Sequence, residues 1–201
     1  QKALSTDIQS TFNMVSVDGD TSTNDMVTIL ANGMSGNKEI VCEGEDFDKF
    51  MLALNTLTVY LCKKIAGDGE GATKMIECKV TGAETLTTAK TVAKSVICSS
   101  LTKAAMFGAD ANWGRVLCAI GYSGAKVDVT KVDVSFISCK GEIKVCKGGA
   151  GTPFSEDEAK EILLQDEITI SINLNSGSEE ATAWGCDLTY DYVKINGDYR
   201  T

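Results

Sequence analysis

The stretch Gly67–Val80, GDGEGATKMIECKV, decides the fold, because a helix ends there, a glycine-rich turn follows and a strand begins. After the turn, apolar and charged residues alternate, which places Ile76, Cys78 and Val80 on one face of a half-buried strand. Glu70 stands between two glycines, whose missing side chains let other backbone or a ligand come close. A lone loop glutamate is most often a solvated surface residue, so that interpretation stays open beside a functional one.

The segments on either side of this stretch have the apolar spacing of helices. From Glu45 to Gly67 apolar side chains recur at helical intervals, and residues 84–100 repeat the pattern. Asp110 and Asn112 then precede an apolar segment and occupy the position of helix caps. The first half of the chain is therefore expected to consist of long helices and one strand.

Downstream of Gly108 the pattern changes to short strands. Three segments have the composition or the alternation of strands: residues 127–137, 142–146 and 168–174. A capping box at Ser155, with a glutamate three residues later, predicts a short helix between the second and third strands. The change near Gly108 is the one boundary signal in the sequence, and the chain is expected to have a mixed α/β (α+β) fold.

The polar stretch Ser16–Asp25, SVDGDTSTND, has three physical explanations: a calcium loop, a phosphate loop or a helix cap. A calcium loop that starts at Asp18 needs a glycine at its sixth position and a glutamate at its twelfth, where this chain has a threonine and an isoleucine. A phosphate loop needs a glycine-rich run and a lysine, and both are missing. The remaining explanation predicts a short capped helix that begins at Met26 and stops before Gly33.

The composition limits the classes of function. With 19 basic and 28 acidic residues and a net charge of −9, the 201-residue chain lacks the basic face that nucleic-acid binding requires. No apolar run reaches membrane-spanning length and no signal segment opens the sequence, so we expect no membrane association and a cytoplasmic location. Histidine is absent, which excludes Ser-His-Asp and Cys-His catalysis within this chain.

The eight cysteines are far apart and never form a CxxC pair. Since the chain has no histidine, a zinc site would need four remote thiolates, and we predict no metal site. Reduced, mostly buried thiols are expected instead, as in a cytosolic protein.

Four blocks follow one another along nearly the whole chain. They are SVDGDTSTNDMVTILANG at residues 16–33, DGEGATK at 68–74, FGADANWGRVLCAIGYSGA at 107–125 and AWGCDLTYDYVKINGDYRT at 183–201. Together they resemble the β chain of the ornithine acetyltransferase family, the glutamate N-acetyltransferases of arginine biosynthesis. Any one block would be a weak signal, but four in the same order are specific.

The resemblance implies a precursor that cuts itself into α and β chains and exposes a threonine at the β N-terminus. The free α-amine of such a residue takes the proton of its own hydroxyl, so no histidine is needed. The acetyl group of N-acetylornithine then passes to the threonine and on to glutamate in a ping-pong cycle. No cofactor is implied, although acetyl-CoA is a second donor to consider.

This sequence departs from the family pattern at its start, Gln1-Lys2-Ala3-Leu4, where the Ala-Thr-Met-Leu junction is missing. The resemblance therefore implies that the nucleophilic threonine lies upstream of Gln1 and that no catalytic residue lies in this chain. By itself, the chain is expected to be inactive.

The resemblance also implies an architecture and partners. Residues 1–107 are expected to form part of a layered α/β/β/α sandwich shared with the α chain, and residues 108–201 a small C-terminal α+β domain. The two chains of the precursor are expected to assemble as an α2β2 heterotetramer.

Three residues match substrate contacts of the family: Glu70, Asn196 and the terminal Thr201. The Glu70 carboxylate is expected to hold the amine of ornithine or to assist the terminal amine of the nucleophile. Asp110 and Asn112 are candidates for supporting residues outside these contacts.

Two other functions remain to be separated from the acetyltransferase. A terminal-nucleophile aminopeptidase or amidase would share the architecture and differ in using water as the acceptor. A non-catalytic subunit would fit a chain in which no nucleophile is seen.

Overall fold

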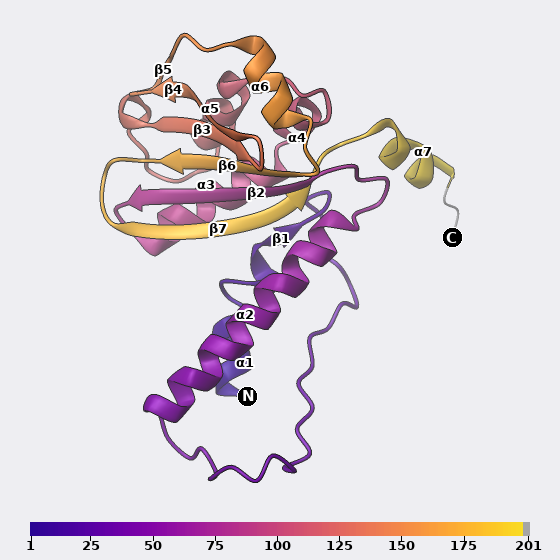
Figure 1. Ribbon diagram of the computed structural model, residues 1–201, viewed down its shortest axis with the longest axis vertical. Coiled ribbons are helices and arrows are strands. Elements are labelled where there is room, and N and C mark those ends of the chain that lie inside the picture. Colours follow the sequence, from indigo (N-terminus) through magenta and orange to yellow (C-terminus); the bar gives the residue numbers. More distant parts are fainter. Residues whose placement is uncertain (199–201) are drawn as a thin grey trace.

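The structure, a computed structural model, describes residues 1–198, in which helices cover a seven-stranded sheet (Figure 1). The helices are α1 (Lys2–Asp7), α2 (Glu45–Gly67), α3 (Leu86–Cys98), α4 (Ser100–Phe107), α5 (Trp113–Gly121), α6 (Glu156–Leu163) and α7 (Tyr190–Asp198), with 3-10 turns η1 (Phe12–Met14) and η2 (Val129–Lys131). The strands are β1 (Val15–Ser16), β2 (Met75–Ala83), β3 (Asp133–Ser138), β4 (Gly141–Lys147), β5 (Ala150–Gly151), β6 (Glu167–Asn173) and β7 (Glu179–Cys186). The mixed α/β fold class expected from the sequence is confirmed.

Strand β2 lies inside the sheet, whose order is β1-β7-β2-β6-β3-β4-β5. It pairs in parallel with β6, where Ile76 stands opposite Ile168, and antiparallel with β7. The alternation predicted for this strand is confirmed, because Ile76, Cys78 and Val80 are buried and Lys79 is exposed. The strand that the glycine-rich turn introduces is thus central to the fold.

Helix α3 packs against β2 and β7 and lies behind the sheet in Figure 1. Its buried stripe includes Val92 and Val96, as the apolar spacing predicted. The single helix expected over residues 84–100 is wrong in its extent, however, because α3 ends at Cys98. Ser99 leaves the helical conformation and its hydroxyl accepts a hydrogen bond from Thr102 N, which caps a separate helix, α4.

Several predicted elements are confirmed by their caps. Helix α5 is capped by Asn112, whose Oδ1 accepts from Arg115 N at 3.2 Å. Helix α6 is capped by Ser155, whose hydroxyl accepts from Glu158 N at 3.3 Å. The strand expected over residues 127–137 begins only at Asp133, since η2 occupies part of that range.

The helix predicted from Met26 to Gly33 is wrong, since residues 17–44 contain neither helix nor strand. The Ser22 turn does form: its hydroxyl accepts from Asp25 N at 3.1 Å. However, Met26 is 84% exposed and Leu30 is 91% exposed, so these apolar side chains are not covered by other described residues. A short helix gains most of its stability by burying an apolar face, and this segment therefore lacks the packing that would hold it helical.

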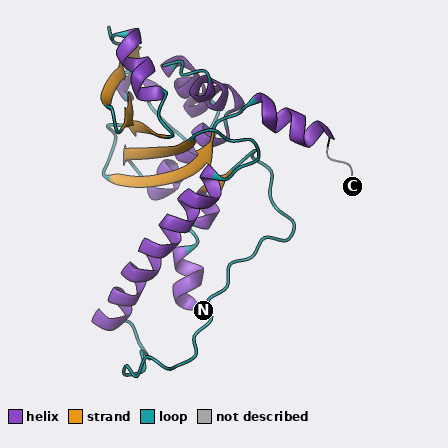
Figure 2. Cartoon of the chain, turned by 45° about the vertical axis from the view of Figure 1, so that its right-hand side comes forward, coloured by secondary structure: helices purple, strands orange, loops and turns teal. Residues whose placement is uncertain are grey.

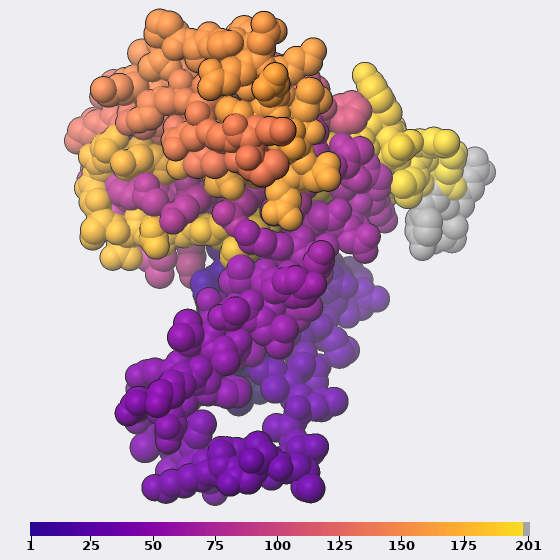
Figure 3. Space-filling model, in the orientation of Figure 1, coloured from indigo at the N-terminus to yellow at the C-terminus, as the bar shows by residue number. Residues whose placement is uncertain are grey.

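Helices α1 and α2 together with residues 17–44 form an arm that stands away from the sheet (Figures 1 and 3). Figure 2 shows the loop leaving the sheet, swinging out away from α2 and returning to the start of that helix. Asp7 joins the two helices, because its buried carboxylate accepts from Asn55 Nδ2 of α2 at 2.8 Å.

The sheet continues across the boundary expected near Gly108. Strand β2 precedes that residue, and its neighbours β6 and β7 follow it. The division into residues 1–107 and 108–201, with the first part in a sandwich shared with a second chain, stays a prediction.

Candidate functional site

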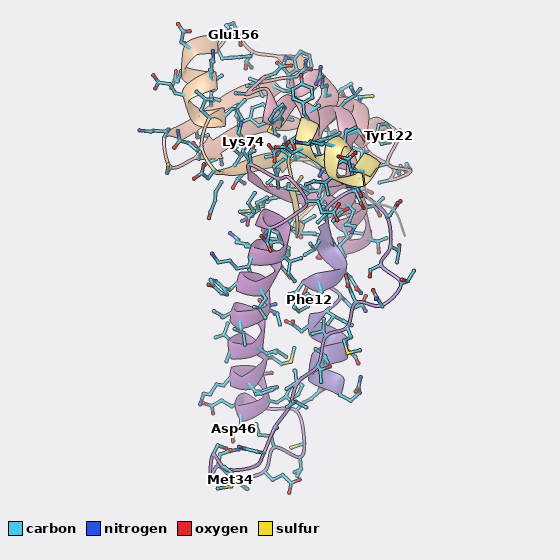
Figure 4. All side chains as sticks on the ribbon, turned by 90° about the vertical axis from the view of Figure 1, so that its right-hand side faces the viewer. Phe12, Met34, Asp46, Lys74, Tyr122 and Glu156 are labelled. Carbon is cyan, nitrogen blue, oxygen red and sulfur yellow. The ribbon has the colours of Figure 1, made fainter. Side chains whose placement is uncertain are left out.

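Two of the predicted site residues meet where the turn before β2 faces helix α7. Asn196 Nδ2 of α7 donates to Glu70 Oε2 at 2.7 Å and to Tyr192 O at 3.0 Å. Figure 4, seen from the side on which α7 lies, shows this helix in front of the sheet and Met34 at the far tip of the arm. The third predicted residue, Thr201, lies outside the described residues.

The turn that carries Glu70 is fixed by Asp187, which follows β7. The Asp187 carboxylate accepts from the backbone N–H of Thr73 at 2.8 Å, the N–H of Lys74 at 3.0 Å and the hydroxyl of Thr73 at 2.5 Å. Because Asp187 is only 3% exposed, these bonds are made away from water. The position of Glu70 is therefore set by the end of the sheet.

The glycines that flank Glu70 permit the close approach that the sequence suggested. Gly71 has φ +66°, and a Cβ there would lie 2.8 Å from Tyr192 N. A Cβ on Gly69 would lie 2.8 Å from Cys186 Sγ. Both positions exclude larger residues, because the backbone of α7 and the end of β7 occupy the space.

Thr189 anchors the start of α7 to the same turn. Its hydroxyl donates to Gly71 O at 2.7 Å and accepts from Tyr192 N at 3.2 Å, as a helix cap does. Tyr190 adds an edge-on contact with Phe107, with ring centroids 5.5 Å apart. The C-terminal block is therefore folded against the turn, which accounts for its polar and aromatic composition.

Tyr192 brings the polar stretch Ser16–Asp25 into this region. Its hydroxyl donates to Asp18 Oδ2 at 3.1 Å. Burial, the hydrogen bond to Asp18 and the nearby carboxylates of Asp18, Glu70 and Asp20 raise the pKa of Tyr192. Three carboxylates thus lie close enough to influence one phenol, and this surface favours a cationic group such as an alkylammonium.

Two buried lysines near the turn donate hydrogen bonds to backbone carbonyl groups. Lys74 Nζ donates to Met106 O at 2.6 Å and to Leu163 O at 2.8 Å, at the ends of α4 and α6. Burial lowers the pKa of Lys74, opposed by the negative charges of Asp187 and Asp166. Lys103 Nζ donates to Val17 O at 2.5 Å and to Cys186 O at 2.6 Å. Lys74 thus joins the turn before β2 to α4 and α6, and Lys103 joins α4 to the end of β7.

Asp110 and Asn112 make hydrogen bonds away from Glu70. Asn112 Nδ2 donates to Asp110 Oδ2 at 3.1 Å, and Asn112 caps α5. Their role in the described structure is to begin that helix. Asp187, Thr189 and Tyr192 were missed as functional candidates, although the polar and aromatic run Asp187–Tyr192 inside the block at 183–201 was a signal for them.

The described part of the chain, residues 1–198, contains neither a metal-binding cluster nor a membrane-spanning helix. Within residues 1–198, no group of three or more histidine, cysteine or acidic side chains is arranged to hold a metal ion. No helix in that range is long and apolar enough to cross a membrane. All eight cysteines are free thiols, with Cys62, Cys78, Cys146 and Cys186 buried.

Comparison with known proteins gives one consistent match. The model of the ArgJ family matches residues 1–201. The arginine biosynthesis bifunctional protein ArgJ 1 of Clostridium acetobutylicum is 56% identical over 200 residues, which cover 100% of this chain and 49% of that protein. The protein named arginine biosynthesis bifunctional protein ArgJ in Caldanaerobacter subterraneus subsp. tengcongensis is 52% identical, again over 100% of this chain and 50% of its own length.

The same similarity holds in three dimensions. A crystal structure of the arginine biosynthesis bifunctional protein ArgJ from Bacillus halodurans superposes with a TM-score of 0.93 and 48% sequence identity. The alignment covers 99% of this chain and 92% of that chain. The present chain spans about half the length of the curated relatives it matches.

Proposed function

This chain belongs to the ArgJ family, and we propose that it is the β part of an acetyltransferase that moves the acetyl group of N-acetylornithine to glutamate. ArgJ enzymes are acyltransferases of arginine biosynthesis, and the relatives are named for that pathway. The observation that carries the proposal is the hydrogen bond between Asn196 and Glu70, which joins two separate family blocks at one site. A terminal-nucleophile hydrolase, the alternative expected from architecture, is not favoured by these relatives.

The paired groups suit the proposed substrate. The Glu70 carboxylate offers an acceptor for an ammonium group, and the Asn196 amide oxygen offers a second acceptor, because the two amide N–H groups are donated to Glu70 Oε2 and Tyr192 O. The neighbouring carboxylates of Asp18 and Asp20 add to the preference for a cation. N-acetylornithine carries an ammonium and an acetamide N–H, so these two groups of the substrate have acceptors of suitable chemistry at this site.

We propose that the acetyl group is carried by a terminal threonine that these 201 residues do not contain. The threonine hydroxyl attacks the acetamide carbonyl while its own α-amine takes the proton, and ornithine leaves as the free amine with that proton. The amine of glutamate then attacks the ester and releases the threonine. No histidine enters the cycle, consistent with a chain that has none. This chain by itself is therefore expected to be inactive.

The proposed partner is the remaining half of the relatives' length, an α chain cut from the same precursor. Helix α2 supports this proposal because its exposed side includes large apolar residues, namely Phe50, Leu52, Leu57, Tyr60, Leu61 and Ile65. An apolar surface of this kind is usually covered by another protein surface. An α2β2 heterotetramer with a shared layered sandwich completes the proposal.

The cycle as proposed needs no cofactor. The relatives are named bifunctional proteins, and we extend the proposal to acetyl-CoA as a second acetyl donor. A cytoplasmic location is also part of the proposal.

The test is acetyl transfer by the complete protein. The full reading frame that encodes this chain is expressed, the two chains are purified together, and acetylglutamate formed from N-acetylornithine and glutamate is measured. Omission of glutamate separates the two enzyme functions: transfer that depends on glutamate supports the proposal, whereas acetate release at the same rate without glutamate would establish a hydrolase. Replacement of N-acetylornithine by acetyl-CoA tests the second donor.

A further inference from the structure

Helix α7 presents Asn196 to Glu70 from a position that its first turn does not fix. The contacts of Thr189 and Gly71 hold the beginning of the helix. Asn196 is seven residues further along, which is about 10 Å at the rise of an α-helix. A second point of attachment along α7 is needed to keep the amide within reach of the carboxylate.

Tyr192 supplies that attachment through its side chain and its backbone. Its side-chain hydroxyl donates to Asp18 Oδ2 at 3.1 Å, and its backbone O accepts from Asn196 Nδ2 at 3.0 Å. Movement of Tyr192 therefore displaces the amide that binds Glu70. The connection links the polar stretch Ser16–Asp25, which has no other assigned role, to the candidate site.

Asp18 is a fixed acceptor, although it lies at the base of the long arm loop. Its Oδ1 accepts from Asp20 N at 2.9 Å, which orders the turn around it. The residue before it is tied to the body, because Val17 O accepts from Lys103 Nζ at 2.5 Å and Lys103 is only 4% exposed. A hydrogen bond to Asp18 is therefore a hydrogen bond to the rigid part of the molecule.

We propose that Tyr192 and Asp18 are positioning residues whose hydrogen bond holds α7 so that Asn196 reaches Glu70 and the two bind substrate together. This inference rests on the proposed function, because it assigns the pair a role at that same site. Burial, the hydrogen bond to Asp18 and the neighbouring carboxylates raise the pKa of Tyr192, which agrees with a phenol that donates to a carboxylate.

The first test uses kinetics of the two-chain enzyme. Tyr192→Phe and Asp18→Ala each remove the hydrogen bond and are expected to raise KM for N-acetylornithine about three- to tenfold, with kcat changed less than about twofold. The double variant should be no worse than the more affected single variant, because both changes break one contact. Asp18→Asn should raise KM less than Asp18→Ala, since both variants lose the charge but the asparagine amide keeps a hydrogen bond with the phenol oxygen.

Tyr190→Phe is the matched control on the same helix. Tyr190 is 84% exposed, and its hydroxyl makes no hydrogen bond within residues 1–198. Its ring contact with Phe107 survives the change to phenylalanine. An unchanged KM in Tyr192→Phe, an equal rise in Tyr190→Phe, or additive effects in the double variant would each overturn the inference.

Hydrogen–deuterium exchange at residues 190–198 gives a readout that does not depend on activity. Exchange is expected to be faster in Tyr192→Phe and Asp18→Ala than in the wild type or Tyr190→Phe, while exchange in β2 stays unchanged. A wild-type enzyme that transfers no acetyl group would overturn the proposed function, and exchange would then decide the inference by itself. Equal exchange at α7 in all variants would overturn it.

Discussion

Asn196 donates a 2.7 Å hydrogen bond to Glu70, although 126 residues separate them in the chain. The contact forms because β7 runs antiparallel to β2 and ends where β2 begins. Asp187, just after β7, therefore holds the turn before β2, and Thr189 anchors the start of α7 to the same turn. The sheet register is thus the physical reason that these two side chains meet. Substitutions of the two residues test whether they bind substrate.

Replacement of Glu70 by glutamine should lower activity of the complete enzyme with little change in stability. If the carboxylate holds the ornithine ammonium, Glu70→Gln removes about 1.5–3 kcal/mol of transition-state binding, or one to two decades in kcat/KM for N-acetylornithine. Thermal unfolding should be nearly unchanged, because Glu70 is an exposed loop residue. Glu142→Gln is the control, since it removes an exposed carboxylate from strand β4 rather than from the turn that carries Glu70. Full activity of Glu70→Gln would return Glu70 to the status of a solvated loop residue.

Asn196→Ala should show that the two residues act as a pair. The change removes the donor to Glu70 and is expected to lower kcat/KM about five- to twentyfold. In the double variant with Glu70→Gln, the combined loss should be smaller than the product of the two single losses, because each change already disrupts the same contact. Independent effects would contradict a joint binding role. Deletion of Thr201, which lies outside the described residues, extends the test to the last predicted site residue.

Local patterns predicted the elements whose side chains face the core of this chain. Strand β2 follows its alternation, because Cys78 and Val80 have neighbours on both sides to pack against. The helix predicted from Met26 failed for the opposite reason, because the capping turn formed but no surface within residues 1–198 covers the apolar side chains. A one-dimensional pattern shows which face is apolar and does not show what will cover it.

The candidate site was predictable only in part. Glu70 and Asn196 were chosen by resemblance to a family, and nothing in their local sequence required them to touch. The contact between Tyr192 and Asp18 spans 174 residues and depends on the end of β7 lying beside the start of the arm. Gly71 did carry a physical signal, since a glycine at the entrance to a strand suggests close approach. The identity of the approaching element, α7, came from the sheet order.

Gly71→Ala should loosen α7 and reduce activity. A Cβ at this position would lie 2.8 Å from Tyr192 N, and its φ of +66° is unfavourable for alanine. We expect at least a tenfold loss in kcat/KM and faster hydrogen exchange in residues 190–198. Gly197→Ala is the control, because a Cβ there would meet no described atom within 4 Å and alanine favours a helix. Equal behaviour of the two variants would show that the close contact at Gly71 is unimportant.

Thiol accessibility should follow burial. Burial, aided by the nearby Asp7 charge, raises the pKa of Cys62 to about 12, and burial also raises the pKa of Cys78. Because the thiolate is the reactive form, these two should be among the last to be alkylated at pH 8, and exposed Cys118 and Cys139 among the first. Mass spectrometry after timed alkylation measures the order. Alkylation of denatured, unreduced protein should label all eight cysteines, and fewer labels would reveal a disulfide.

The exposed apolar side chains of the arm lead to a prediction about assembly. Residues 1–201 expressed alone should aggregate or form a molten species, because Leu52 and Leu57 of α2 are 71% and 56% exposed and Met34 of the loop is 82% exposed. Co-expression with the rest of the reading frame should give a soluble complex with one cooperative unfolding transition. Light scattering and calorimetry measure the two outcomes.

Charge substitutions on the arm separate partner binding from folding of the sheet. Leu52→Lys and Leu57→Lys place a charge on the exposed side of α2 and should prevent purification of the two chains together, because a buried unpaired charge is costly. Glu156→Lys is the control, since it puts a lysine at the start of α6 rather than on the arm (Figure 4). It should cost about 1 kcal/mol at the helix terminus and leave assembly intact. A monodisperse, cooperatively folded single chain, or complexes that survive both leucine changes, would show that the exposed side of α2 is not the interface.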